Sequence, residues 1–177
     1  ILAVTFTNKA AKEMRGRLWK LIGSTNAVGN DTSLRLQGVE RFSEFTSENL
    51  AEGSTPPRSF MPWMGTFHSI CVRILRMDGV QIGLDPRFVI YDSDDQLGLI
   101  KQQMRARGLT DRDIKPRSVA AAISNAKNSL TSAADFADNA TGPMQQKIAE
   151  LFLAYEKAIR KASALDFDDL LVKTVEL

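Results

Sequence analysis

The sequence has one cysteine and one histidine, Cys71 and His68, in 177 residues. A single cysteine excludes a disulfide framework, and one histidine without cysteine partners offers no zinc-type ligand set. No apolar run approaches the roughly 20 residues that a membrane-spanning helix needs. We therefore expect no bound metal in this chain, no disulfide and no membrane association.

The sequence also lacks a large excess of either charge, because it has 23 basic and 21 acidic residues and a net charge of +2. This balance is too mild to indicate nucleic-acid binding by itself. The imbalance is local instead, with only Glu13 opposing a cluster of five cations between residues 9 and 20: Lys9, Lys12, Arg15, Arg17 and Lys20. From charge alone, a solvated helix face is the favoured interpretation.

Two nucleotide-binding patterns are missing as well. The sequence holds no GxxxxGK[ST] loop, which would wrap phosphates and supply a lysine and a magnesium-binding hydroxyl. It also holds no apolar strand that ends in an Asp-Glu pair, the usual ligand for magnesium in such sites. We therefore expect no catalytic residue in this chain and no hydrolytic capacity of its own.

Residues 1–23 have the pattern of a buried strand that leads into a helix. Ile1–Val4 is an apolar run without alternation, which is typical of a strand covered on both faces. From Lys9 onward the apolar residues recur with a helical period, and Gly23 is placed to end that helix. Thr7 or Asn8 can cap its start, and a helix start of this kind binds anions through free amides and the dipole.

The run ILAVTFTNKAAKEM resembles motif Ia of the UvrD/Rep/PcrA-type superfamily 1 DNA helicases. In that family the strand and helix belong to the first RecA-like motor domain, and the turn between them holds single-stranded DNA. The resemblance implies DNA contacts by Thr5, Phe6, Thr7, Asn8 and Lys9. It also implies a nucleotide contact by Arg17 across the motor cleft.

A second run, GTFHSICVRILR, resembles motif Ib of the same family. An amphipathic helix is predicted over Phe67–Met77, with Thr66 placed to cap it. The resemblance implies that Thr66 and His68 meet the DNA strand. The Thr66 hydroxyl suits a phosphate oxygen, and Phe67 or His68 could lie against a base. Without the surrounding motif, His68 would be interpreted as a hydrogen-bonded packing residue.

Three further runs, FVIYDSDDQLGLIKQ, ISNAKN and ALDFDDLL, resemble the family's helical insert and its motif Id. Their carboxylate clusters look like metal ligands, but Ser93 with Gln96 and Asp166 with Asp169 have the spacing of capping boxes. Helix capping is the better supported interpretation of both clusters. Lys127 and the nearby Arg117 could touch duplex phosphate, and solvated surface is at least as good an interpretation for both.

The expected fold is mainly α, with a helical insert domain, called 1B, attached to a βα remnant of a RecA-like P-loop NTPase domain. Residues 1–23 would belong to the motor domain, and residues 24–62 would form a partly flexible connecting insertion or linker. Residues 63–166 would form domain 1B including motif Ib, and residues 167–177 would be the helix that returns to the motor domain.

The resemblance implies a fragment of an ATP-dependent 3′–5′ DNA helicase, and a chain that opens inside a core-type strand suits this expectation. The parent would use ATP and Mg²⁺, act in the bacterial cytoplasm, and bind single-stranded DNA and its junction with duplex. Repair or replication proteins are possible partners. Two alternatives stay open: a stand-alone helical module for DNA binding or protein docking, and the helicase–nuclease subunit of a recombination complex.

Overall fold

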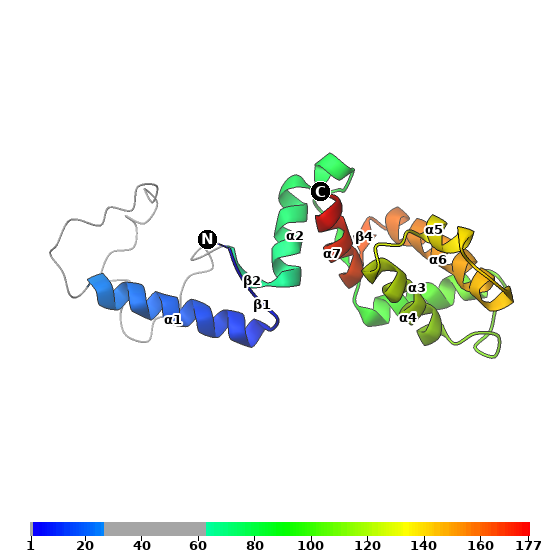
Figure 1. Cartoon of the computed structure of the whole chain (residues 1–177), viewed down its shortest axis with the longest axis horizontal. Coiled ribbons are helices and arrows are strands. Elements are labelled where there is room, and N and C mark those ends of the chain that lie inside the picture. Colours follow the sequence, from blue (N-terminus) through cyan, green and yellow to red (C-terminus); the bar gives the residue numbers. More distant parts are fainter. Residues whose placement is uncertain (1, 27–62) are drawn as a thin grey trace. The chain divides into compact units, whose positions relative to one another are not determined.

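The computed structural model describes residues 2–26 and 63–177 (Figure 1). The connecting insertion expected at residues 24–62 therefore lies outside the described residues from residue 27 onward. The chain divides into two compact units, residues 1–70 and residues 71–177. Each unit is described below by itself.

The first unit is built around two short parallel strands that are far apart in the sequence. Strand β1 (Ala3–Thr5) pairs in parallel with β2 (Met64–Thr66), in a register that places Thr5 beside Thr66. Helix α1 (Asn8–Asn26) follows β1, and helix α2 (Phe67–Asp78) follows β2 directly. The guanidinium of Arg15 on α1 donates to the backbone carbonyl of Met64 at 3.1 Å, which ties α1 to β2.

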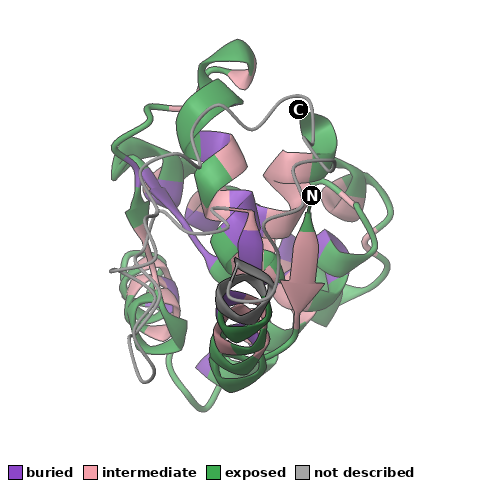
Figure 2. Cartoon of the chain, turned by 90° about the vertical axis from the view of Figure 1, so that its left-hand side faces the viewer, coloured by how far each residue is buried: buried purple, intermediate pink, exposed green. Residues whose placement is uncertain are grey.

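Some boundaries predicted for this unit are wrong. The strand predicted over Ile1–Val4 is observed at Ala3–Thr5, so it starts and ends later than predicted, and Ile1 lies outside the described residues. β1 is also only half-buried, as the colour of the strand beside the N label in Figure 2 shows. Helix α1 continues past Gly23 to Asn26, because a glycine permits a helix end without requiring one. The sequence pattern did not predict β2, a strand of three residues that includes a glycine.

The second unit is mainly helical, as expected. After the rest of α2, a 3₁₀ turn (Gly79–Ile82) leads to strand β3 (Val89–Ile90), which pairs in parallel with β4 (Ala164–Leu165). No helix in the described part of the chain combines the length and the apolar character that crossing a membrane requires. The remaining helices are α3 (Ser93–Arg105), α4 (Pro116–Asn128), α5 (Ala133–Asp138), α6 (Pro143–Lys161) and α7 (Phe167–Glu176).

The core of the second unit lies where α3, α4 and α6 pack together. Proline begins both α4 and α6, because its fixed φ suits the first turn and its missing N–H is not needed there. Each fully buried large side chain contributes about 1.5–3 kcal/mol of hydrophobic stabilisation. The largest fully buried side chains of this core are Ile100, Met104, Val119, Ile123, Leu151, Phe152 and Tyr155.

Two of the helices begin with a carboxylate capping box. The predicted pair at Asp166 and Asp169 is confirmed: each side chain accepts a hydrogen bond from the other residue's backbone N–H. The predicted cap at Ser93 is wrong, because the box of α3 is made by Asp92 and Asp95 instead. An aspartate directly before the helix competes well for the cap position, and the serine then becomes the first helical residue.

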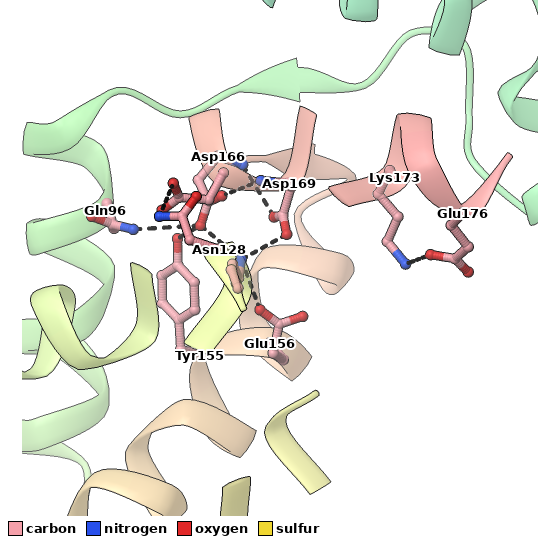
Figure 3. Close-up of polar contacts among 10 residues, drawn as sticks. Gln96, Asn128, Tyr155, Glu156, Asp166, Asp169, Lys173 and Glu176 are labelled. Atoms are coloured by element: carbon pink, nitrogen blue, oxygen red, sulfur yellow. Dashed lines mark hydrogen bonds and ion pairs between the residues drawn. The ribbon is translucent and has the colours of Figure 1, made fainter. Parts of the chain in front are cut away.

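Lys127 does not lie on the surface, so the expectation that it contacts solvent or duplex phosphate is wrong. Its side chain is buried between helices α4, α6 and α7. The ammonium lies 2.8 Å from a carboxylate oxygen of Asp166, 2.6 Å from one of Asp169 and 2.9 Å from one of Glu156. Figure 3 shows these contacts meeting between the three carboxylates, with the Tyr155 hydroxyl donating to Asp166. The lysine thus takes the place that a metal cation would take among such ligands.

Burial and mutual charge shift the pKa values of this cluster. Burial, together with the charges of Asp166 and Glu156, raises the pKa of Asp169 to about 6 despite its contact with Lys127. Burial alone would raise the pKa of Asp166 too, but the Lys127 ammonium and several hydrogen bonds hold it below its usual value. Burial and the neighbouring Asp166 raise the pKa of Tyr155, which keeps its hydroxyl protonated as a donor.

Replacing the buried cation is expected to be costly. Lys127→Met removes the ammonium and leaves the carboxylates of Asp166 and Asp169 buried without a counter-charge. We expect the free energy of unfolding to fall by about 3–5 kcal/mol, measured by urea unfolding. Lys101→Met changes an exposed lysine on α3 and should stay within about 0.5 kcal/mol of the unsubstituted chain. Equal losses in the two variants would contradict the role assigned to Lys127.

The raised pKa of Asp169 predicts a specific pH dependence. Between pH 4 and pH 6 the folded chain holds a proton on Asp169 that the unfolded chain has released, so this residue's contribution to stability falls as pH rises. Asp169→Asn removes that titration. The stability of the variant relative to the unsubstituted chain should therefore rise between pH 4 and pH 7, measured by urea unfolding at several pH values. A difference that does not change with pH would refute the assignment.

Candidate nucleic-acid interface

The parallel pairing of β1 and β2 brings two of the predicted site segments together. Parallel strands place their carboxyl ends at the same edge of a sheet. Because Thr5 is the register partner of Thr66, the two strands end at the same edge. Helix α1 begins after Phe6 and Thr7, and α2 begins directly after β2, so the two helix starts lie next to each other. Figure 1 shows β1 and β2 side by side.

The two helix starts are capped in the same way by threonine. The backbone N–H of Ala10 donates to the Thr7 hydroxyl at 3.2 Å, and that of Ser69 donates to the Thr66 hydroxyl at 3.4 Å. Each cap accepts from the third residue of its helix, as the usual N-cap does. Thr7 is thus the cap of α1, which resolves the choice left open between Thr7 and Asn8. A neutral hydroxyl cap leaves the positive end of the helix dipole uncompensated by charge.

Two aromatic rings stand at the same edge. The rings of Phe6 and Phe67 approach to 5.3 Å between centroids, with 48° between their planes. The side chain of Phe6 is 90% exposed and that of Phe67 45% exposed. Large apolar side chains of this kind are normally buried, so an exposed pair beside two helix starts is typical of a binding surface. Flat rings in this position suit the faces of nucleic-acid bases.

The other predicted site residues lie around this edge. Asn8 and Lys9 are exposed in the first turn of α1, and His68 is half-buried in the first turn of α2. Arg17 is exposed farther along α1 and pairs with Glu13 at 2.6 Å. The structure therefore brings the motif Ia and Ib residues together, while Arg17 lies two turns further along the helix.

The second parallel ladder, formed by β3 and β4, differs from the first, formed by β1 and β2, in the charge at its helix starts. There, too, each strand leads into a helix, but α3 and α7 carry aspartate caps and further acidic residues in their first turns. Those carboxylates already supply the negative charge that a helix start attracts. Helices α1 and α2 have no acidic residue in the first turn. Of the two ladders, the one formed by β1 and β2 is thus suited to an external anion.

Three residues that support this edge were not predicted as part of the site. The guanidinium of Arg15 holds α1 to β2, as described above, and was noted only for its charge. Gly65 lies so close to Ser69 that a Cβ there would come within 2.4 Å of the Ser69 hydroxyl. That hydroxyl donates to the carbonyl of Thr66 at 2.8 Å. In the sequence, the glycine directly before Thr66 is the signal of this packing, because the close approach of the Ser69 side chain to the backbone requires a glycine there.

The residues present do not fit an ATP site. The sequence contains no phosphate-binding GxxxxGK[ST] loop. In the described part of the chain, no group of His, Cys, Asp and Glu side chains is placed to hold a metal ion. The chemistry that the β1–β2 edge does offer is binding: donors for phosphate oxygens, one lysine, and aromatic faces.

Comparison with known proteins places the chain in a family. A family model described as the UvrD/REP helicase N-terminal domain matches residues 1–177. The chain belongs to the UvrD/Rep helicase family. It is similar to the ATP-dependent DNA helicase PcrA of Bacillus subtilis (strain 168) and of Staphylococcus aureus (strain NCTC 8325), with 36% identity to each over 177 residues. The PcrA helicase of Staphylococcus epidermidis is 35% identical over the same length.

The match covers all of this UvrD/Rep-family chain but only part of each relative. It includes 100% of the chain and 20% of the PcrA proteins named above. The chain thus spans about a fifth of the length of these relatives. The resemblance seen in the motifs is confirmed at the level of the family.

The close packing at Gly65 predicts a testable pair of substitutions. Gly65→Ala should displace the Ser69 hydroxyl and lower the free energy of unfolding by about 1–3 kcal/mol, measured by urea unfolding. Adding Ser69→Ala removes the obstructing atom. The double variant should then be no less stable than Ser69→Ala alone, whose lost hydrogen bond costs about 1 kcal/mol.

Gly16→Ala is the matched control, because a Cβ at Gly16 on α1 meets nothing within 4 Å. Alanine is favoured over glycine inside a helix, so this change should be neutral or stabilising by up to about 1 kcal/mol. If Gly65→Ala were as well tolerated as Gly16→Ala, the packing role of Gly65 would be wrong.

Proposed function

We propose that this chain supplies a single-stranded DNA-holding surface of an ATP-dependent DNA helicase. The observation that carries the proposal is the side-by-side placement of two threonine-capped helix starts with the exposed Phe6–Phe67 pair. Membership of the UvrD/Rep family and the printed names of the PcrA relatives supply the reaction class. The whole protein would use ATP hydrolysis to move along DNA in the 3′–5′ direction and separate the duplex.

In this proposal the DNA backbone lies along the edge where β1 and β2 end. First-turn amides of α1 and α2 donate to phosphate oxygens, and the ammonium of Lys9 adds a mobile counter-charge. The side chains of Asn8 and of the threonines at the edge provide further hydrogen bonds to phosphate or sugar. The threonines concerned are Thr5, Thr7 and Thr66.

The bases would lie against aromatic side chains. Phe6 and Phe67 offer their exposed faces, and His68 adjoins them at the start of α2. Stacking of this kind contributes about 1–3 kcal/mol per base and is indifferent to the base, because every base has a π-face. A motor that moves along any sequence needs contacts with this property.

The motor function would depend on segments of the whole protein other than this chain. ATP and Mg²⁺ would be held there, and Arg17 would reach toward the nucleotide from α1. Residues 1–23 and the helix at 167–177 would belong to the motor domain, and residues 63–166 to the inserted helical domain 1B. The helicase would act on DNA in the bacterial cytoplasm, at junctions of single-stranded and duplex DNA, alongside repair or replication proteins.

The test is binding of a labelled oligothymidylate to the purified chain, followed by fluorescence anisotropy. We expect salt-sensitive binding, because phosphate contacts release counterions. Phe6→Ala and Phe67→Ala should each cost about 1–3 kcal/mol of binding free energy. The chain should show no ATP hydrolysis under any of these conditions.

Phe167→Ala is the matched control. Phe167 is also the first residue of a helix that follows a parallel strand, and its exposure is 46% against 45% for Phe67. Helix α7, however, begins with carboxylate caps, so removing the Phe167 ring should leave oligothymidylate binding unchanged. Loss of binding equal to that of Phe67→Ala, or no loss in the double variant Phe6→Ala with Phe67→Ala, would reject the proposal.

A further inference from the structure

The second unit contains a groove that the proposed function does not use. It has a volume of about 820 Å³ and lies between the connection from α4 to α5, one face of α6, and α7. We call it the α6–α7 groove. Leu130 lines it from the connection, Leu153 and Lys157 from α6, and Val172 from α7.

Leu130 is held in a conformation that leucine rarely adopts. Helix α4 ends in a Schellman motif: the N–H of Leu130 donates to the carbonyl of Lys127, and the N–H of Thr131 to that of Ala126, each at 2.9 Å. Leu130 occupies the left-handed position of this motif, with φ +54°, where glycine is the usual residue. Its side chain is nevertheless 63% exposed and lines the groove. Backbone strain of this kind clusters at functional sites and ligand clamps, so the exposed Leu130 side chain is a candidate contact for a partner.

The rest of the groove lining combines aliphatic side chains with exposed basic ones, Lys157, Arg160 and Lys161, which we call its basic rim. Leu153 is 45% exposed in the middle of α6 and adds a second large aliphatic side chain. At the end of α6, Lys157, Arg160 and Lys161 line the same groove, and none of the described residues forms an ion pair with them.

The acidic residues of the groove do not neutralise this rim. Glu156 and Asp169 are engaged by the buried ammonium of Lys127, and Glu176 pairs with Lys173. The positive charge of Lys157, Arg160 and Lys161 is therefore available to a partner that carries carboxylates.

We propose that the α6–α7 groove is a docking site for an acidic, amphipathic peptide segment of a partner protein. Large apolar side chains of that segment would contact Leu130 and Leu153, and its carboxylates would face Lys157, Arg160 and Lys161. An amphipathic helix laid into a groove presents apolar anchors at i, i+4 and i+7, with charged residues beside them, which suits a lining of aliphatic and basic side chains.

The lining favours a peptide over nucleic acid. A surface for single strands combines cations with exposed aromatic rings on which bases stack. The ring of Phe152, the aromatic residue of the groove, is 1% exposed. The exposed apolar residues here are aliphatic, unlike Phe6 and Phe67 at the edge of β1 and β2.

The experiment uses the whole chain and a labelled helical peptide with leucines at i, i+4 and i+7 and glutamates on either side. Binding is followed by fluorescence anisotropy. A matched peptide with lysines in place of the glutamates should bind at least about tenfold more weakly. Lys157→Glu should reduce affinity for the acidic peptide and raise it for the basic one.

Leu130→Gly separates binding from folding. Glycine suits the left-handed position, so the melting temperature should stay the same or rise, while affinity for the acidic peptide falls at least about fivefold. Phe67→Ala should leave peptide affinity unchanged.

Unchanged affinity in Leu130→Gly, or equal binding of the two peptides, would overturn the proposal. Weakened oligothymidylate binding in Leu130→Gly and Lys157→Glu, without peptide binding, would assign the groove to nucleic acid instead.

Discussion

The parallel pairing of β1 with β2 is the constraint on which the candidate interface depends. The two strands are three residues each and are separated by most of the first unit's sequence, yet their register places Thr5 beside Thr66. A parallel ladder aligns strand ends, and each of these ends opens directly into a helix. Two helix starts and two exposed rings are thereby fixed next to each other, although neither segment alone would form more than one weak anion site.

The chain uses the same strand-to-helix device twice, with opposite electrostatic results. Helices α1 and α2 begin with threonine caps and no acidic residue, and they leave positive potential at their ends. Helices α3 and α7 begin with aspartate boxes that satisfy the amides and compensate the dipole internally. The identity of the cap therefore decides whether a helix start is left suited to an external anion or has its charge compensated by its own side chains.

Lys127 gives the second unit a charged centre. One ammonium holds carboxylates from α6 and from the start of α7, with Tyr155 as a further donor to Asp166. Breaking such a group is costly because any member left alone is a buried charge. The engagement of Glu156 and Asp169 also has an effect at the surface, since it leaves the basic residues at the end of α6 without local counter-charge.

The amino-acid sequence is enough to predict the family, the mainly helical fold, most helix starts and the segments that resemble the two motifs. These features depend on local patterns: apolar periodicity, proline at a first turn, and capping residues at fixed spacing. Three features are seen only in the folded chain: strand β2, the contact between Phe6 and Phe67, and the burial of Lys127. A three-residue strand and a lysine on a helix carry no local signal for their partners. Their environment is set by segments distant in the sequence, and pairing and burial across such distances follow from the packing of the whole unit.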